Sequence, residues 1–379
     1  MKYTFAVLIW FSIVFTSCKN ASINEVNTNL DSLKTSKSVL YAKGFSIEKI
    51  DKNSVIKVFD PWQKGKILKS YYLYHQGDSI PARFKNYSAV KIPLEKIAVT
   101  SLDNVGFLNL LASLKKVVAV SDYQRIYNPE IKKGIDLKHI KNIGPAVDVN
   151  FESLISSQAE AVFSTTYNTY DHKTDLFEKA SITLIYNMDW MENTALGRAE
   201  WLKFVAAFLD KDAMADSIFK HIDIRYNVLK HKAIVSKNKP SVLVGSNYKE
   251  VWYLPGGKSY KASLLKDAGA DYFWKNDKNL GSLSLSFEKV IEVASNSKIW
   301  IDVSFLSFKE LISADERYSV FTACSNTLIY NNLGMSKGLA NDYWETGLCR
   351  PDIILEDLVE IFHPNILNHK LVYYKKLEF

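Results

Sequence analysis

The stretch from Trp190 to Lys232 constrains the fold more than any other part of the sequence, because two helical patterns follow one another in it with almost no break. Asn193 or Thr194 can cap the first helix. In each pattern, apolar residues recur with the 3.6-residue period of a helix and form one face. They are Trp201, Phe204, Val205, Phe208 and Leu209 in the first pattern and Ala215, Ile218, Phe219, Ile222, Tyr226 and Leu229 in the second.

The second pattern predicts a helix over 213–233, which would be about 32 Å long at 1.5 Å per residue. This length matches the diameter of a small domain, so we interpret 193–236 as a pair of stiff interlobe helices. The alternative is an ordinary long helix inside one larger domain. A chain of 379 residues, 47% of them hydrophobic, is too long for one typical core and suits two lobes.

The N-terminal residues predict export. Lys2 supplies a positive charge, and the apolar run 3–15 is too short for a comfortable membrane span. Residues 1–18 resemble a bacterial lipoprotein signal in which Cys18 becomes the lipidated first residue, although Phe15 stands where leucine is usual. We therefore expect a protein lipid-anchored at Cys18 on the periplasmic side of a bacterial membrane. A plain secretory signal and an N-terminal membrane anchor are the alternatives.

Composition limits the partners of the exported chain. Residues 19–38 are rich in Asn, Ser and Lys and are typical of a flexible tether. The formal net charge of the whole chain is only +7 and is spread along the sequence, so we expect no nucleic-acid partner. An exported compartment permits a disulfide between Cys324 and Cys349, and the sequence leaves their pairing open.

Short apolar strands alternate with helices on both sides of the interlobe helices, which is typical of βαβ units and a parallel sheet. The predicted strands are 97–101, 117–121, 161–164, 183–186, 241–245 and 299–303, and the predicted helices are 102–114, 151–157, 174–180, 260–267, 287–294 and 353–361. The runs 45–50, 54–59 and 70–75 predict an antiparallel layer before them. The predicted fold class is α/β, with two lobes of mostly parallel sheets flanked by helices and joined by a long rigid helix. The lobes are predicted at 39–192 and 237–379.

A weak internal repeat supports two similar lobes. Residues 148–155 precede the strand AVFST, and residues 284–291 precede the strand IWIDV. Each segment places a glutamate, Glu152 or Glu288, second after a polar residue that can cap a helix. A glutamate in the first turn is favoured by the helix dipole. This preference explains the presence of each glutamate, but it does not explain why both lobes repeat the surrounding sequence pattern.

Five segments in this order resemble the class III, helical-backbone substrate-binding proteins of ABC importers, the group for ferric siderophores, haem and cobalamin. The resemblance covers roughly residues 91–379. The segments are IGPAVDVNFESLISSQAEAVFST, NTALGRAEWLKFVAAFLDKDAMADSIF, VWYLPGGKSYKASLLKDAGADYFW, LSFEKVIEVASNSKIWI and RPDIILEDLVEIFHP. The layer 41–92 and the WY-PGG-SY stretch are similar to a branch of Bacteroidetes-type lipoproteins.

The resemblance implies a monomeric carrier that catalyses nothing and holds no cofactor. It would capture a metal chelate or tetrapyrrole between its lobes and deliver it to an ABC permease dimer with its ATPase. Glu152 and Glu288 match the surface glutamates that dock on arginines of the two permease subunits in this family. Two separated carboxylates facing a symmetric basic partner provide register and steering.

Ligands of open α/β sheets bind beyond the carboxyl ends of the strands, so the candidate ligand contacts follow predicted strands. They are Asp103, Tyr123, Arg125, Tyr167, Asn168 and Trp190 in the first lobe and Asn247, Tyr248, Trp252, Tyr253 and Tyr260 in the second. The segment NYKEVWYLPGGKSY has four aromatic residues that cannot all be core. Arg125, Lys258 and Arg317 can pair with a net anionic chelate. Ordinary loop packing is the alternative for each of these residues.

Other functions have weaker support in the sequence. A phosphate-binding loop is excluded at PGGKS, because Trp252 stands where its first glycine would be. No G-x-S-x-G or H-E-x-x-H motif marks an enzyme. The 7 histidines show no close ligand spacing, so no metal site is predicted. A transition-metal binding protein of an ABC importer remains the alternative, followed by a secreted enzyme.

Overall fold

A four-stranded sheet opens the part of the chain that the computed structural model describes, which is residues 39–167 and 174–379. Its strands are β1 (Phe45–Ile50), β2 (Asn53–Phe59), β3 (Ile67–His75) and β4 (Ser88–Ile92). The first three are antiparallel neighbours, as the sequence predicts, and β4 pairs with β3 in parallel. Phe45, Val58 and Leu73 anchor this sheet in the core of the first lobe.

The main sheet of the first lobe has five parallel strands in the order β7-β6-β5-β8-β9. The strands are β5 (Ile97–Val99), β6 (Val117–Val120), β7 (Lys141–Asn142), β8 (Ala161–Ser164) and β9 (Thr183–Tyr186), and the helices are α1 (Leu102–Leu110), α2 (Pro129–Asp136), α3 (Phe151–Ser156) and α4 (Thr174–Lys179). Strand β5 is buried along its whole length, as expected of a parallel sheet covered on both faces. The predicted elements are confirmed apart from their ends, whereas α2 and β7 were missed.

Three helices follow the first lobe, namely α5 (Ala195–Ala199), α6 (Trp201–Ala207) and α7 (Asp212–Ile234). Of the two predicted caps, Thr194 is the one used, since its hydroxyl accepts a hydrogen bond from the Gly197 amide at 3.1 Å. The predicted apolar face of the first pattern is buried. Helix α7 has 23 residues and is therefore about 35 Å long.

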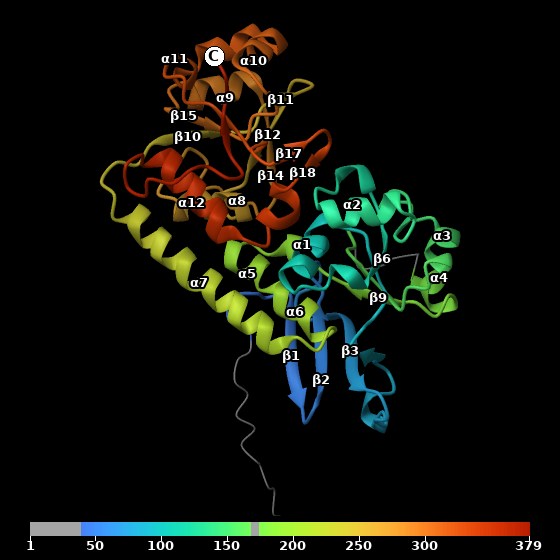
Figure 1. The fold of residues 1–379 in the computed structure, drawn as a ribbon. Coiled ribbons are helices and arrows are strands. Elements are labelled where there is room, and N and C mark those ends of the chain that lie inside the picture. The colour runs from blue at the N-terminus through green and yellow to red at the C-terminus, as the bar shows by residue number, and fades with distance from the viewer. Residues whose placement is uncertain (1–38, 168–173) are drawn as a thin grey trace, which may run out of the picture. The chain divides into compact units, whose positions relative to one another are not determined.

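Helix α7 packs against both hydrophobic cores. Its first turn contributes Ala215 to the core of the first lobe, and Phe219, Ile222 and Leu229 belong to the core of the second. Ile218 contacts both cores. Figure 1 shows α7 running past α6 and then beside α12 (Pro351–Phe362). Residues of the segment 193–236 belong to both cores, and the lobe boundaries at 39–192 and 237–379 remain a proposal.

The second lobe has a smaller parallel sheet than the first. Strands β13, β10 and β15 form it, and β11, β12 and β14 form a separate antiparallel sheet. The bounds are β10 (Ser241–Val244), β11 (Asn247–Tyr248), β12 (Val251–Pro255), β13 (Asp271–Tyr272), β14 (Ser282–Ser286) and β15 (Ile299–Ile301). The predicted β10 and β15 are confirmed, and the antiparallel sheet was not predicted.

Helices cover these sheets and short strand pairs close the lobe. The helices are α8 (Tyr260–Asp267), α9 (Phe287–Ala294), α10 (Phe308–Ala314), α11 (Thr322–Ser325), α12 and the π-helix η6 (Tyr343–Gly347). The short strands are β16 (Tyr330–Asn331), β17 (Ser336–Lys337), β18 (Ala340–Asn341) and β19 (Lys375–Lys376). Helices α8, α9 and α12 were predicted, whereas the π-helix and the hairpin β17–β18 were not.

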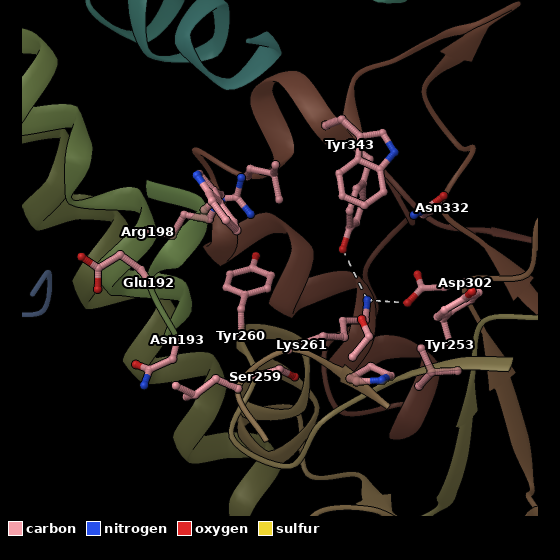
Figure 2. Close-up of a pocket in the computed structure, with 18 of the residues that line it drawn as sticks. Glu192, Asn193, Arg198, Tyr253, Ser259, Tyr260, Lys261, Asp302, Asn332 and Tyr343 are labelled. Atoms are coloured by element: carbon pink, nitrogen blue, oxygen red, sulfur yellow. Dashed lines mark hydrogen bonds and ion pairs between the residues drawn. The ribbon is translucent and has the colours of Figure 1, made fainter. Parts of the chain in front are cut away.

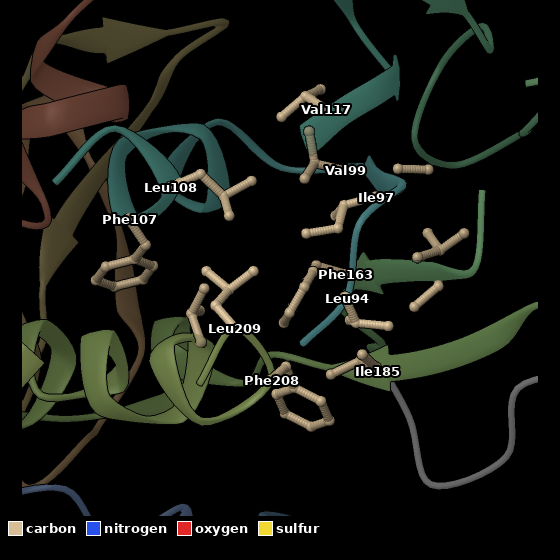
Figure 3. Packing of buried hydrophobic residues seen from close by; sticks show 14 of the residues in the cluster. Leu94, Ile97, Val99, Phe107, Leu108, Val117, Phe163, Ile185, Phe208 and Leu209 are labelled. Atoms are coloured by element: carbon tan, nitrogen blue, oxygen red, sulfur yellow. The ribbon is translucent and has the colours of Figure 1, made fainter. Parts of the chain in front are cut away.

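The first core joins the parallel sheet to α1 and the interlobe helices. In Figure 3, Phe107 and Leu108 of α1 lie opposite Phe208 and Leu209, with Phe163 of β8 beside them. Cys349 belongs to this core and Cys324 to the other, and within the described residues both cysteines are free and buried. Among the helices described, none is both long and apolar enough to span a membrane.

Candidate ligand-binding site

A cavity of about 840 Å³ lies between the segment 190–198 and the second lobe (Figure 2). The remaining walls come from the β12–α8 region and from residues in 280–282, 302–304 and 332–348. Its aromatic lining residues are Trp190, Tyr253, Tyr260, Tyr343 and Trp344. A concave site of this volume with aromatic walls and a few polar groups is typical of small-molecule binding.

Three of the sequence-predicted residues meet in this cavity. Tyr253 lines it because side chains alternate along β12, so that Tyr253 is 52% exposed between two buried neighbours. Tyr260 begins α8, whose start is fixed by the Ser259 hydroxyl accepting from the Ala262 amide at 3.2 Å. Trp190 lies in the 3₁₀ turn Asp189–Met191 that precedes the interlobe helices.

The predicted contacts before Tyr253 lie elsewhere. The prediction that Trp252 contacts the ligand is wrong. Its indole is fully buried in the second core, and its Nε1–H donates to the Val244 carbonyl at 2.8 Å. Tyr248 is 63% exposed and does not line the cavity. Asn247 is half-buried, and its backbone N–H donates to the Tyr318 hydroxyl at 3.0 Å.

The other predicted residues of the first lobe that the structure describes lie outside the main cavity. Tyr123 and Arg125 line a separate cavity of about 360 Å³ near Leu339 of the β17–β18 hairpin. Tyr167 is exposed, and its ring centre is 5.6 Å from that of Trp190 at the edge of the main cavity. Asn168 lies outside the described residues.

Arg198 of α5 brings a guanidinium to the cavity wall, and two buried carboxylates neutralise it. Its Nε donates to Asp189 at 2.7 Å, and its Nη2 lies 3.3 Å from Asp103. Burial and the neighbouring Asp103 raise the pKa of Asp189 well above its usual range. Burial acts to lower the pKa of Arg198, but Asp189 and Asp103 outweigh it and raise that pKa. Asp103 therefore acts behind Arg198 and does not line the cavity.

Lys261 supplies a second neutralised cation. Its Nζ lies 2.6 Å from an Asp302 oxygen and donates to the Tyr343 hydroxyl at 3.3 Å (Figure 2). It also donates to the Tyr374 hydroxyl at 2.7 Å. The Tyr374 hydroxyl donates to the other Asp302 oxygen at 2.8 Å. Burial acts to lower the pKa of Lys261, and the Asp302 carboxylate outweighs it and raises that pKa.

Sequence reasoning missed Lys261 and Asp302, although a signal was present for the aspartate. Asp302 directly follows the buried run IWI of β15, at the carboxyl end of a parallel strand. Its φ of 57° places it in the left-handed region, which aspartate and asparagine tolerate better than most residues.

The hydroxyl of Tyr260 is buried and has no hydrogen-bond partner among the described residues. Its ring extends from α8 into the space between Arg198 and Tyr343 (Figure 2). The Arg198 guanidinium carbon is 5.6 Å from the ring centre. Burial raises the pKa of this phenol, so it stays protonated. A buried hydroxyl facing a cavity without a partner is a group that a ligand can satisfy.

Glu152 and Glu288 occupy equivalent places on exposed helix ends. Each is the second residue of its helix, and the preceding caps, Asn150 and Ser286, accept from the amides of Ser153 and Lys289. Both glutamates are exposed. Hydrogen bonds from its own amide and from the Ser286 hydroxyl lower the pKa of Glu288.

The cations predicted for an anionic ligand are not in the main cavity. Arg317 binds Asp315 at 2.7 Å and also lies near Glu250 and Glu288. Lys258 is exposed and does not line the cavity. Across residues 39–167 and 174–379, no three His, Cys, Asp or Glu side chains are grouped so that they could hold a metal ion.

The structure therefore combines two α/β lobes, a long helix that packs against both cores, and a cavity bounded by the segment 190–198 and the second lobe. The chain belongs to the periplasmic binding protein family, whose model matches residues 97–331, more than half of the sequence. Two relatives are uncharacterized lipoproteins of Methanocaldococcus jannaschii. One is 24% identical over 368 residues, covering 90% of this chain and 86% of its own length, and the other is 23% identical over 344 residues, covering 85% of each.

Solved structures share the fold at low sequence identity. A periplasmic heme binding protein from Pseudomonas aeruginosa superposes with a TM-score of 0.57 and 13% identity, covering 76% of this chain and 99% of its own. A possible iron-binding, periplasmic solute-binding protein from Staphylococcus epidermidis gives a TM-score of 0.55 and 17% identity, covering 72% of this chain and 99% of its own. At these identities the likeness establishes the architecture alone.

Proposed function

We propose that this chain is the substrate-binding protein of an ABC importer and that it holds its ligand in the cavity of about 840 Å³. Membership of the periplasmic binding protein family supports this function. The observation that carries it is the aromatic wall around the buried Tyr260 hydroxyl, which has no hydrogen-bond partner within 39–167 and 174–379. The protein itself catalyses no reaction in this proposal, and the permease with its ATPase drives uptake.

We propose a ferric siderophore, haem or cobalamin as the ligand. The heme-binding and possible iron-binding proteins that share the fold support this class. Trp190 and Trp344 line the cavity, so a ligand that absorbs near their emission should quench their fluorescence. Titration with haem, cobalamin and several ferric siderophores should give saturable quenching by at least one of them. No saturable binding in the whole set, checked by calorimetry, would remove the proposal.

The Tyr260 hydroxyl provides the sharpest test of the site. In Tyr260→Phe, a buried unpaired polar group is lost, so the free energy of unfolding without ligand should stay constant or rise by about 1 kcal/mol. Ligand affinity should fall by about tenfold, because a hydrogen bond to ligand is lost. Tyr248→Phe is the matched control, since Tyr248 is exposed outside the cavity. Unchanged ligand affinity in Tyr260→Phe would show that the ligand binds away from the Tyr260 hydroxyl.

We further propose that Glu152 and Glu288 dock on the permease. Both are exposed in the first turn of matching helices, one in each lobe. The double variant Glu152→Ala with Glu288→Ala should keep ligand affinity and abolish uptake in cells. Glu292→Ala, an exposed glutamate elsewhere on α9, is the control that should still support uptake. Loss of ligand affinity in the double variant would argue against docking as their role.

The lipid anchor at Cys18 is also a proposal, because residues 1–38 lie outside the described part. The similarity to proteins named lipoproteins supports it. Mass spectrometry of the membrane-extracted protein should find acyl chains on Cys18, and Cys18→Ala should release the protein from the membrane. An unmodified cysteine in the mature protein would favour a plain secretory signal.

A further inference from the structure

The charged groups around the cavity balance one another before any ligand arrives. Arg198 and Lys261 are the cations among its lining residues. The carboxylates of Asp189 and Asp103 pair with the Arg198 guanidinium. The carboxylate of Asp302 lies 2.6 Å from the Lys261 ammonium nitrogen. The charge of each cation is therefore balanced before a ligand arrives, and the three N–H donors of Lys261 already have partners, so a ligand carboxylate would have to displace Asp302 to pair with Lys261.

Glu192 adds a further negative charge to the same wall. Glu192 is a lining residue, but its carboxylate points away from the cavity and accepts from the amides of Lys43 and Gly44 and from the indole of Trp201 (Figure 2). Two cations face four acids in this group, so the formal charge is −2 when all are ionised. Burial raises the pKa values of Glu192 and Asp189, and protonation of both would bring the formal charge to zero. The wall is not positive in any of these states.

The remaining lining groups are neutral. Asn193, Ser282, Ser304 and Asn332 supply amides and hydroxyls, and the tyrosines and tryptophans supply aromatic faces. Amides and hydroxyls pair with uncharged polar groups on a ligand, whereas electron-rich ring faces attract cations.

From this arrangement we infer that the cavity selects a ligand without net negative charge, either neutral or cationic, and rejects a carboxylate-bearing or catecholate chelate of similar size. Among the proposed ligands, this favours cobalamin and neutral or cationic ferric siderophores over haem, which carries two propionates. This inference rests on the proposed function, because it assigns selectivity to the same cavity. It contradicts the expectation from the sequence that basic side chains hold an anionic chelate. The Asp302–Lys261 pair is the one we test, since a single carboxylate neutralises Lys261 whereas two carboxylates neutralise Arg198.

Pairs of related probes that carry different charges test the inference on the full-length protein. Haem is compared with its dimethyl ester, and cobalamin with a derivative in which one side-chain amide is hydrolysed to a carboxylate. A ferric trihydroxamate of charge zero or +1 is compared with a ferric tricatecholate of charge −3. Within any pair that binds, the neutral or cationic member should bind at least tenfold more tightly. Equal or tighter binding of the anionic member would overturn the inference and leave the proposed function standing.

A swap at Asp302 provides the second arm. Asp302→Asn frees the Lys261 ammonium, and asparagine tolerates the left-handed backbone there. The preference for the neutral member should shrink or reverse in this variant. Asp315→Asn, which removes one carboxylate partner of Arg317 outside the cavity, should leave the preference unchanged. An unaltered preference in a folded Asp302→Asn protein would refute the role of the Asp302–Lys261 pair. If this variant does not fold, the titration of the wild type with the probe pairs decides the inference. Failure of every probe to bind would remove the proposed function and the inference together.

Discussion

Adjacent residues of the π-helix η6 face two regions that differ in how tightly they are packed. Tyr343 and Trp344 line the cavity, and Trp344 keeps 48% of its surface exposed. Glu345 is fully buried, and its carboxylate accepts from the amides of Tyr127 at 2.7 Å and Asn128 at 3.1 Å in the first lobe. One short helix therefore provides both a wall of the open site and a fixed contact between the lobes. Such single π-turns are frequent at functional sites.

The fixed contact is made between backbones. Helix α1 approaches η6 so closely at Gly106 that an added Cβ would lie 2.2 Å from the Glu345 carbonyl oxygen and 2.8 Å from the Cys349 sulfur. The Cys349 thiol is also 3.4 Å from the Asp103 carbonyl. Close-packed contacts resist gradual deformation. We therefore expect the cavity to accommodate ligands through its side chains and loops and the lobes to move little.

Arg198 joins the two regions, because it lines the cavity and binds Asp103 at the start of α1. Arg198→Met would leave two buried carboxylates without their cationic partner, so the free energy of unfolding should fall by about 3–5 kcal/mol. Urea denaturation measures the change. Arg317→Met is the control, because that side chain is 41% exposed and its loss should cost less than about 1 kcal/mol. If both variants lose the same small amount, Arg198 does not tie the cavity to the fixed contact.

The sequence predicted the framework well, because periodicity reports burial directly. The apolar face from Trp201 to Leu209 became part of the first core, and the run at 161–164 became β8 with the predicted ends. The same logic could have corrected the prediction for Trp252. In the run Val251–Pro255, alternation puts Trp252 and Leu254 on the buried face and Tyr253 on the open face.

The cavity was harder to predict, because loops far apart in the sequence converge on it. Trp190, Asp302 and Trp344 are separated by more than 40 residues each, and no local pattern relates them. Charge pairing was hidden for the same reason. Arg317 has its partner Asp315 two residues away, whereas Arg198 and Asp103 meet only when α1 and α5 pack.

The buried carboxylate of Glu345 should make the fixed contact depend on pH. Burial raises its pKa to about 7 from a usual value of 4.5. The folded state therefore binds this proton more tightly than the unfolded state. The resulting stabilisation is fully present below pH 4.5 and disappears as the pH rises through about 7, a loss of about 3 kcal/mol.

Glutamine keeps an acceptor oxygen without the titration, so Glu345→Gln isolates this effect. The free energy of unfolding of the wild type minus that of Glu345→Gln should decrease by about 3 kcal/mol between pH 4.5 and pH 7.5. Chemical denaturation at several pH values measures it. Glu152→Gln controls for the removal of an exposed carboxylate from the first lobe. If the difference between the two proteins stays constant over this pH range, the buried site accommodates the Glu345 carboxylate in its ionised form.

Gly106 tests whether the closeness of the backbones itself matters. Gly106→Ala should lower the free energy of unfolding by about 2 kcal/mol, because overpacking against a carbonyl outweighs the gain of about 1 kcal/mol that alanine brings to a helix. Gly281→Ala lies on the cavity side, where an added Cβ meets nothing within 4 Å, and should change stability by less than about 0.5 kcal/mol. Thermal and urea unfolding of both variants measure the contrast. If Gly106→Ala is as stable as the wild type, the contact between α1 and η6 can relax, and wider movement of the lobes around the ligand becomes the better description.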